Sequence, residues 1–191
     1  LELKKSLLNQ EHQKKLELKK NIYKIAKKSM DDLNATNALV GVVDSSSGEV
    51  VAMVDVLNYS DVKEKLYDLS VLNYSYEPGS VISPLIYAIA LESNITTPSQ
   101  SINCYQGKFK IDNKYITDTY QYDHLSAEDV LVYSSNIGIS QIALSLGSIS
   151  LHEGLKEFSL EDYATYYEKQ ELIGSVPSVQ KLENNIYRAT T

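Results

Sequence analysis

The segment Leu85–Leu91 constrains the fold more than any other part of this sequence, because it is apolar on every side. A helix that is hydrophobic all round is a buried helix. The breaker Glu77-Pro78-Gly79-Ser80 precedes this segment, and the polar stretch Asn94–Ser99 ends it. The chain must therefore build a core around this helix, and its 191 residues, 43% of them hydrophobic, suffice for one domain or one and a half.

The residues before the buried helix have the pattern of a long helix followed by a β-hairpin. Apolar residues recur at helical spacing within residues 1–33, and lysines fill the other faces. Two apolar runs, 38–43 and 50–56, then flank the turn Asp44–Gly48. Because neither run alternates with polar residues, we expect both faces of this sheet to be covered.

The residues after the buried helix predict a second hairpin and a capped helix. Residues 108–111 and 114–117 form the hairpin, which turns at Asp112-Asn113. Ser126-Ala127-Glu128-Asp129 is a helix-start signal, and a helical apolar stripe then runs from Ile139 to Leu146, with Gly147 as its C-cap. Beyond Leu151 the signals are weak. The order of these elements indicates a mixed α and β domain.

Charge is distributed unevenly, which argues against nucleic acid as a partner. The net charge is −7, yet the first 28 residues hold nine lysines against three acidic residues. The remainder therefore carries −13, and nucleic-acid-binding domains are basic. Solvated lysines on a helix face are the favoured explanation of the basic stretch, and contact with an anionic lipid or polyanion is the alternative.

No membrane-spanning run, signal peptide, disulfide or metal site is expected within these residues. There is no run of 18 apolar residues, and the chain begins with Leu1 rather than Met, which is compatible with an upstream segment. Cys104 is the one cysteine, and we expect it to be a packed apolar residue. The three histidines lie far apart without ligand spacing, so we expect no metal and no cofactor.

Ser80 is a candidate nucleophile because of its place after the Pro78-Gly79 turn. This turn leads into the buried helix, so Ser80 is expected at or near a helix N-terminus, where free N–H groups favour negative charge. Backbone donors there could stabilise an oxyanion on a substrate that the serine attacks. Taken alone, an N-cap serine is the favoured alternative.

Ser134 and Asn136 form a second candidate constellation. Their side chains diverge if the residues share a regular helix, so they can act together only where the backbone is irregular. That geometry fits a break between two helical pieces, 130–133 and 137–146. A polar joint between helices, without any chemical role, is the favoured alternative when this segment is taken alone.

Two segments of the chain, taken together and in their sequence order, resemble the transpeptidase domain of class B penicillin-binding proteins. They are Tyr76-Glu77-Pro78-Gly79-Ser80 before the apolar helix and Ser134-Ser135-Asn136-Ile137-Gly138 about fifty residues later. Further stretches match in family order, namely Asn9–Gln13, Leu39–Asp44, Ser47–Met53, Asp118 with Leu125–Leu131, and Glu171–Pro177.

The resemblance implies an α+β fold of the β-lactamase/transpeptidase type. That fold has an antiparallel sheet with helices on both faces, plus a mostly helical subdomain. Residues 1–191 would form a partial transpeptidase domain, with a helix and the first hairpin in 1–57 and the helical subdomain in 58–191. The C-terminal strands of the fold would lie beyond Thr191.

The resemblance also implies a reaction and a place in the cell. Ser80 would attack stem peptides ending in D-Ala-D-Ala, Ser134 would relay protons, and Asn136 would bind the substrate amide. The activity would be D,D-transpeptidation of peptidoglycan in division or elongation, with β-lactams as covalent ligands and other wall-synthesis proteins as partners. The location would be the outer face of the inner membrane in the bacterial cell envelope, through an anchor outside this chain.

Two departures from the family pattern predict impaired activity. The family motif S-x-x-K places a lysine one turn after the nucleophile, and this chain has Ser83 there. A neutral hydroxyl is a poor base, and losing a general base costs about 10²–10⁴ in rate. The third motif, K-[ST]-G, is absent from these residues, and His152-Glu153-Gly154, the nearest spelling, is expected on the surface.

A pseudoenzyme is therefore the alternative, with the same fold kept as a scaffold or binding module. Ser83 and the acidic body of the chain both favour it. A penicillin hydrolase is disfavoured, because no residue supplies the extra carboxylate base that such enzymes use for deacylation.

Overall fold

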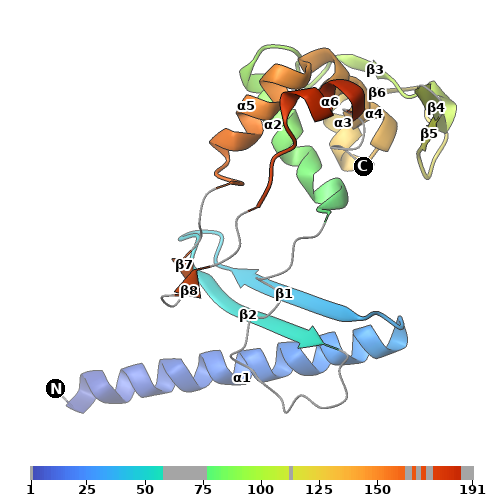
Figure 1. Cartoon of the computed structure of the whole chain (residues 1–191). Coiled ribbons are helices and arrows are strands. Elements are labelled where there is room, and N and C mark those ends of the chain that lie inside the picture. The colour runs from blue at the N-terminus through green and yellow to red at the C-terminus, as the bar shows by residue number, and fades with distance from the viewer. Residues whose placement is uncertain are drawn as a thin grey trace. The chain divides into compact units, whose positions relative to one another are not determined.

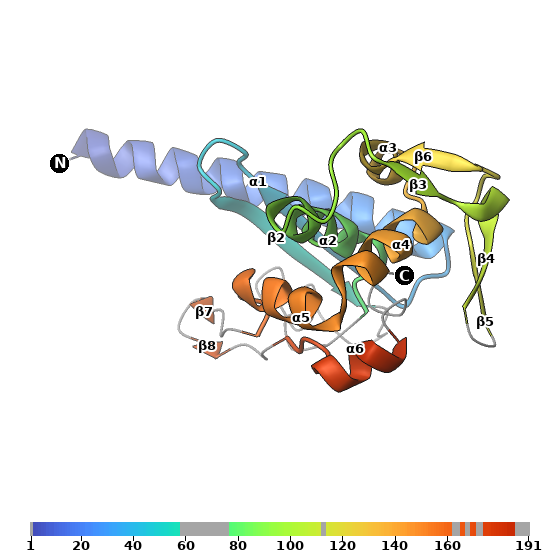
Figure 2. The same cartoon turned by 90° about the horizontal axis from the view of Figure 1, so that it is seen from above.

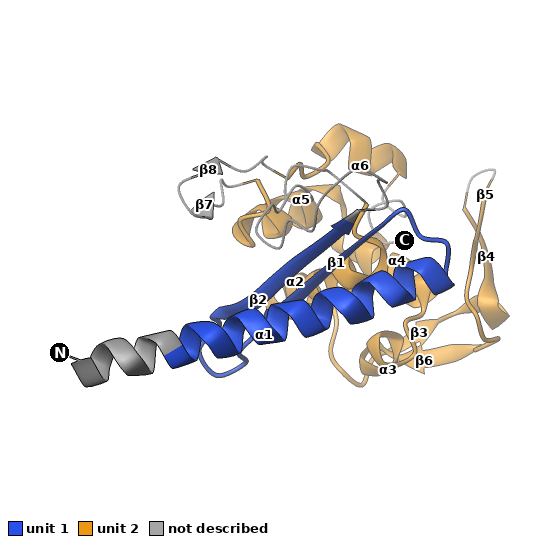
Figure 3. Ribbon diagram, turned by 90° about the horizontal axis from the view of Figure 1, so that it is seen from below, with its two compact units in different colours: residues 1–74 blue, residues 75–191 orange. Residues whose placement is uncertain are grey.

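The chain divides into two compact units, residues 1–74 and 75–191 (Figure 3). The computed structural model describes residues 2–57, 77–111, 114–161, 165–166, 169–170 and 174–185. The predicted boundary after residue 57 falls where a stretch outside the described residues begins, so it stays a prediction. Among the described helices, none is both long enough and apolar enough to cross a membrane.

The first unit is a long helix beside a two-stranded antiparallel hairpin, as the sequence predicts. Its elements are α1 (Glu2–Asp32), β1 (Asn37–Val43) and β2 (Val50–Leu57). Asn37 pairs with Leu57 and Val43 with Val50, and a bulge interrupts the register next to Val43. Both Figure 1 and Figure 2 show α1 running along the hairpin.

One face of the hairpin packs against α1. Val54 and Val56 are almost completely buried against Ala26 and Met30 of the helix. Successive strand residues point to opposite faces, so this contact accounts for every second residue of β2. On the other face, Leu39, Val43 and Val50 are between 39% and 57% exposed. A cover for that second face stays a prediction.

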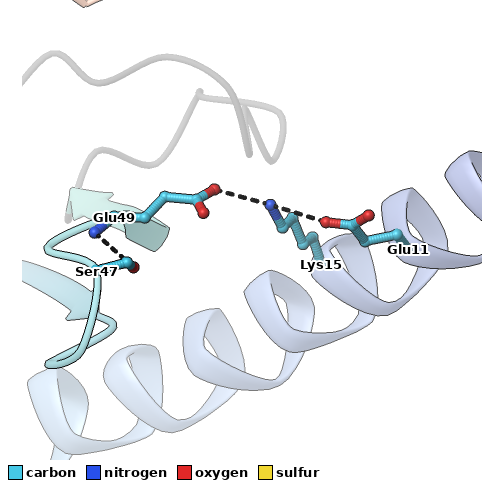
Figure 4. A network of polar contacts seen from close by, with 4 residues as sticks. All are labelled: Glu11, Lys15, Ser47 and Glu49. Atoms are coloured by element: carbon cyan, nitrogen blue, oxygen red, sulfur yellow. Dashed lines mark hydrogen bonds and ion pairs between the residues drawn. The ribbon is translucent and has the colours of Figure 1, made fainter.

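An ion pair joins the middle of α1 to Glu49, the residue just before β2 (Figure 4). The Lys15 ammonium donates to a carboxylate oxygen of Glu49 at 3.0 Å and lies 3.4 Å from Glu11. The backbone N–H of Glu49 in turn donates to the Ser47 hydroxyl at 3.2 Å. The hydrogen bond to Glu49 contributes most to raising the pKa of Lys15. Exposed ion pairs contribute little stability, so this network adds little to what the apolar contact between α1 and the hairpin provides.

The second unit is mostly helical, with short antiparallel strands (Figure 2). The helices are η2 (Gly79–Ile82), α2 (Ser83–Glu92), η3 (Tyr105–Gly107), α3 (Ala127–Val132), α4 (Asn136–Leu146), α5 (Ser148–Glu157) and α6 (Val179–Asn185). The strand pairs are β3 (Ser101–Asn103) with β6 (His124–Ser126), β4 (Lys108–Ile111) with β5 (Lys114–Thr117), and β7 (Thr165–Tyr166) with β8 (Lys169–Gln170).

The apolar helix predicted from the sequence is α2, and it lies at the centre of the second unit's core. Ile86 and Ala90 have no exposed surface. They belong to one hydrophobic cluster with Ile139 of α4 and Leu151 of α5. Ala88 is exposed, so the burial of α2 is extensive but not complete.

The predicted start and end signals act as capping theory requires. The Ser126 hydroxyl accepts from the Asp129 N–H at 3.0 Å and begins α3, while Gly147 ends α4 with φ +82°. The β4–β5 hairpin has the predicted strands, and its turn at Asp112-Asn113 lies outside the described residues. The sequence did not indicate α5, α6 or the β3–β6 pair.

The stretch His152-Glu153-Gly154 was expected on the surface, and only Glu153 is exposed there. The three residues lie in α5, and Gly154 packs against α2 so closely that an added Cβ would lie 2.6 Å from Ile89. His152 is half-buried, with Nδ1 3.0 Å from the Pro177 carbonyl oxygen. The surface prediction is therefore wrong for two of the three residues.

We predict that Gly107→Ala destabilises the second unit more than Gly79→Ala does. Both glycines have a left-handed φ, +79° and +62°, which costs an alanine about 1–2 kcal/mol. Only at Gly107 would the new Cβ also meet backbone, 2.9 Å from the Tyr120 carbonyl oxygen. Overpacking there adds about 1–3 kcal/mol. Urea unfolding followed by circular dichroism measures the difference, and equal losses would contradict the crowding at Gly107.

Candidate active site

Ser80 lies exposed in the single turn of 3₁₀-helix that leads directly into α2. The turn starts after Pro78 with Gly79 in a left-handed conformation, φ +62°. The Ser83 N–H donates to the Ser80 carbonyl oxygen, which joins η2 to α2. The predicted position of Ser80 near a helix N-terminus is confirmed.

The N-cap explanation of Ser80 is wrong. The N-cap residue of α2 is Ile82, and neither η2 nor α2 has a side-chain capping bond. Among the described residues, the Ser80 hydroxyl makes no hydrogen bond, so it is exposed without a capping task. Its side chain therefore has no structural hydrogen bond among these residues.

Ser83 is the first residue of α2 and is 8% exposed. Residues three apart on a helix lie on neighbouring positions of one face, so Ser83 follows Ser80 by one turn. Its hydroxyl is neutral near pH 7, and no hydrogen bond of this hydroxyl is seen within the described part of the chain. Position 83 therefore supplies no proton acceptor stronger than a hydroxyl.

Ser134 lies in the predicted break between two helices. α3 ends at Val132 and α4 begins at Asn136, and Ser134 between them is exposed with φ +51°. Its N–H still donates to the Leu131 carbonyl oxygen at 3.1 Å, which closes the end of α3. The break gives Ser134 and Asn136 the irregular backbone that the sequence argument required.

Ser135 and Asp118 hold this joint, and sequence reasoning gave neither of them a role at the site. The Ser135 hydroxyl accepts from the Gly138 N–H at 2.8 Å and donates to Asp118 Oδ2 at 2.5 Å. Asp118 Oδ1 accepts from the Ile137 N–H at 3.0 Å. Asn136 donates through Nδ2 to the Thr117 carbonyl oxygen at 3.2 Å. A serine before a helical stripe is an N-cap signal, so the role of Ser135 was detectable from sequence.

Cys104 is completely buried behind this joint, with its sulfur 3.6 Å from the Ser135 hydroxyl oxygen. Burial raises the pKa of the thiol, and the charge of Asp118 acts in the same direction. Because only a thiolate is nucleophilic, Cys104 is a packing residue, as predicted.

Three tyrosine rings pack in a row that starts at Tyr133, the residue before Ser134. Tyr133 packs on Tyr122 at a centroid distance of 5.1 Å, and Tyr122 lies 6.1 Å from Tyr120. Desolvation raises the pKa of Tyr122. Tyr133 and Tyr120 are half exposed or more. Tyr74 and Tyr76, which flank the first motif in sequence, lie outside the described residues.

Both motif segments are anchored in the same hydrophobic cluster. Ile82 and Ile86 follow Ser80, Val130 precedes Ser134, and all three apolar side chains belong to the cluster around α2. Among the described residues, no hydrogen bond links Ser80 or Ser83 with Ser134 or Asn136. Within the same residues, no three His, Cys, Asp or Glu side chains gather where they could hold a metal ion.

Comparison with known proteins identifies the family. Residues 38–190 match the family model "penicillin binding protein transpeptidase domain". The chain belongs to this family. The class B transpeptidase resemblance and the α+β fold class inferred from the motifs are thereby confirmed.

Curated relatives of this transpeptidase-domain chain are bacterial enzymes of peptidoglycan synthesis. It is 28% identical over 155 residues to peptidoglycan D,D-transpeptidase FtsI of Escherichia coli K12, covering 78% of this chain and 26% of that protein. It is 30% identical over 138 residues to the probable D,D-transpeptidase PbpC of Pseudomonas aeruginosa, covering 70% and 24%. The chain thus spans about a quarter of the length of these relatives.

A solved structure supports the fold of this penicillin-binding-protein domain. The apo transpeptidase domain of penicillin-binding protein 3 from Burkholderia pseudomallei superposes with a TM-score of 0.72 at 24% identity. The match covers 88% of this chain and 47% of that domain.

We predict that Cys104 in this domain resists alkylation until the protein unfolds. Because the pKa of the thiol is raised on folding, its ionisation favours the unfolded chain, and stability is lost as pH rises above about 8.5. Iodoacetamide labelling at pH 8 should be slow in the folded protein and fast in urea. Cys104→Ala should remove part of the decline in melting temperature between pH 8 and 10, and rapid labelling of the folded protein would contradict the burial.

Proposed function

We propose that this chain carries the acyl-transfer serine of a peptidoglycan D,D-transpeptidase. The observation that carries the proposal is the exposure of Ser80 in an uncapped turn, with the Ser134–Asn136 joint built on the same core. The match of the family model, which spans both segments, supports it. Stem peptides ending in D-Ala-D-Ala are the proposed substrates, and β-lactams are the proposed covalent ligands.

The proposed reaction has two steps. The Ser80 hydroxyl oxygen bonds to the carbonyl carbon of the penultimate D-Ala, the peptide C–N bond breaks, and the terminal D-Ala leaves with the proton. An amine of a neighbouring stem then bonds to the same carbon, and the ester C–O bond breaks. Ser80 recovers a proton. In both steps, Ser134 relays the proton and Asn136 binds the substrate amide.

Ser83 favours a second candidate function, a scaffold of the same fold that interacts with other wall-synthesis proteins. The residue is neutral and largely buried, so the turn after Ser80 holds no ammonium or amine. Without that base, acylation is expected to slow by about 10²–10⁴. The proposed location for either function is the outer face of the inner membrane in a bacterial envelope.

We predict that a fluorescent penicillin labels Ser80 in the full-length protein, slowly in the parent and about 10²–10⁴ times faster in Ser83→Lys. A lysine at this buried position would have a lowered pKa and could accept the serine proton. Gel fluorescence over time gives the rates, and peptide mass spectrometry gives the position of the label.

Three variants control this experiment. Ser83→Met has a long side chain without an amine and should stay as slow as the parent. Ser93→Ala, which changes an exposed serine at the other end of α2, should label like the parent, whereas Ser80→Ala should not label. Absence of labelling in both the parent and Ser83→Lys would contradict the enzyme proposal, and labelling only in Ser83→Lys would favour the scaffold.

A further inference from the structure

We propose that Asp118 is a positioning residue for the second motif, acting through Ser135 on Ser134 and Asn136. The expected effect of Asp118 on acylation rests on the proposed function. Its expected effect on the backbone of the joint rests on the hydrogen bonds alone. Asp118 lies directly after β5, far from the motif in sequence. Its carboxylate is the element that ties the end of that strand to the start of α4.

The tie consists of three hydrogen bonds to three consecutive residues. The Asp118 carboxylate accepts from the Ser135 hydroxyl at 2.5 Å and from the Ile137 N–H at 3.0 Å. Between them, the Asn136 side chain donates to the Thr117 carbonyl oxygen at 3.2 Å. The end of β5 therefore hydrogen-bonds to each of residues 135–137. The side-chain nitrogen of Asn136 is engaged in this way, whereas its side-chain oxygen has no partner among the described residues.

The strand end is itself held in place. The Asp118 N–H donates to the Gly107 carbonyl oxygen at 3.1 Å. Gly107 packs directly against the backbone of Tyr120 and Gln121, where even a methyl group would collide. Asp118 thus has little freedom to follow the joint if the joint moves, and this makes it an anchor.

Ser134 depends on this anchor because its backbone conformation is unfavourable. A left-handed φ of +51° is costly for a residue with a Cβ, and such residues persist where the surroundings determine them. On one side, Ser135 donates its N–H to the Val130 carbonyl oxygen at 3.0 Å. On the other side, Asp118 and Ser135 satisfy the free N–H groups of Ile137 and Gly138. These hydrogen bonds restrain the backbone next to Ser134 and thereby favour its left-handed conformation.

Charge makes the carboxylate hard to replace. Asp118 places a negative charge at the N-terminus of the eleven-residue helix α4, where the helix dipole favours it. An asparagine there could accept from only one of the two donors, because its second group is itself a donor. The Ser135 hydroxyl would then lose its acceptor while it still caps Gly138.

The experiment compares Asp118→Asn with Asp129→Asn. Asp129 is a matched control, because it accepts from the Ser126 hydroxyl at 2.7 Å in the cap of α3 but touches no motif residue. The acylation rate at saturating penicillin is measured in the full-length Ser83→Lys protein, at a temperature where every variant is folded. We expect about a 10²-fold loss in Asp118→Asn and less than about a two-fold loss in Asp129→Asn.

A double variant separates positioning from general destabilisation. If Asp118 acts through Ser135, Asp118→Asn combined with Ser135→Ala should be no slower than the worse single variant, because coupled residues are not additive. Additive losses, or equal losses in Asp118→Asn and Asp129→Asn, would overturn the proposal.

Hydrogen exchange keeps this test distinct from the test of the proposed function. In the parent protein, Asp118→Asn should speed amide exchange at Ile137 and Gly138, and Asp129→Asn should leave these two amides unchanged. If penicillin labels no version, the enzyme proposal fails, and faster exchange still supports the positioning role. Unchanged exchange at Ile137 and Gly138 overturns it in every case.

Discussion

The burial of α2 is the constraint on which the second unit depends. Ile86 and Ala90 are fully enclosed, and α4 and α5 pack directly on the helix, while α3 contributes Ala127 and Val130 to the same cluster. Protein cores are close-packed, and a shift of one element opens a cavity or a clash. Because Ser80 lies in the turn that leads into α2 and Ser134 follows a helix packed on the same cluster, the positions of both motifs depend on this core.

A polar tie complements the apolar core at the joint before α4. The first N–H groups of a helix lack partners within it. At the start of α4, the Asp118 carboxylate accepts from the Ile137 N–H and the Ser135 hydroxyl accepts from the Gly138 N–H. Cys104 packs behind the joint. Its thiol stays neutral because burial raises the thiol pKa. The exposed loop residue Ser134 is therefore flanked by a buried partner, Ser135, and a partly buried one, Asp118.

The residue at position 83 bears on the proposed chemistry of this family but not on the local fold. The turn around Ser80 and the start of α2 form without a lysine, since the hydrogen bond that joins them is between backbone groups. Fold does not imply function, and we propose that the side chain at position 83 distinguishes an acylating enzyme from a scaffold. The geometry built by the core is compatible with both.

The sequence by itself determined the local elements and the family. The all-round apolar pattern of Leu85–Leu91 and the caps at Ser126 and Gly147 predicted their elements, because periodicity and capping are local effects. The sequence could not predict α5, in which Gly154 is explained only by its contact with Ile89. The partnership of Asp118 with Ser135 was equally invisible, since residues seventeen apart meet only when the strand end and the helix start are packed together. Tertiary structure decided those contacts, because long-range pairs form only after a shared core brings their elements together.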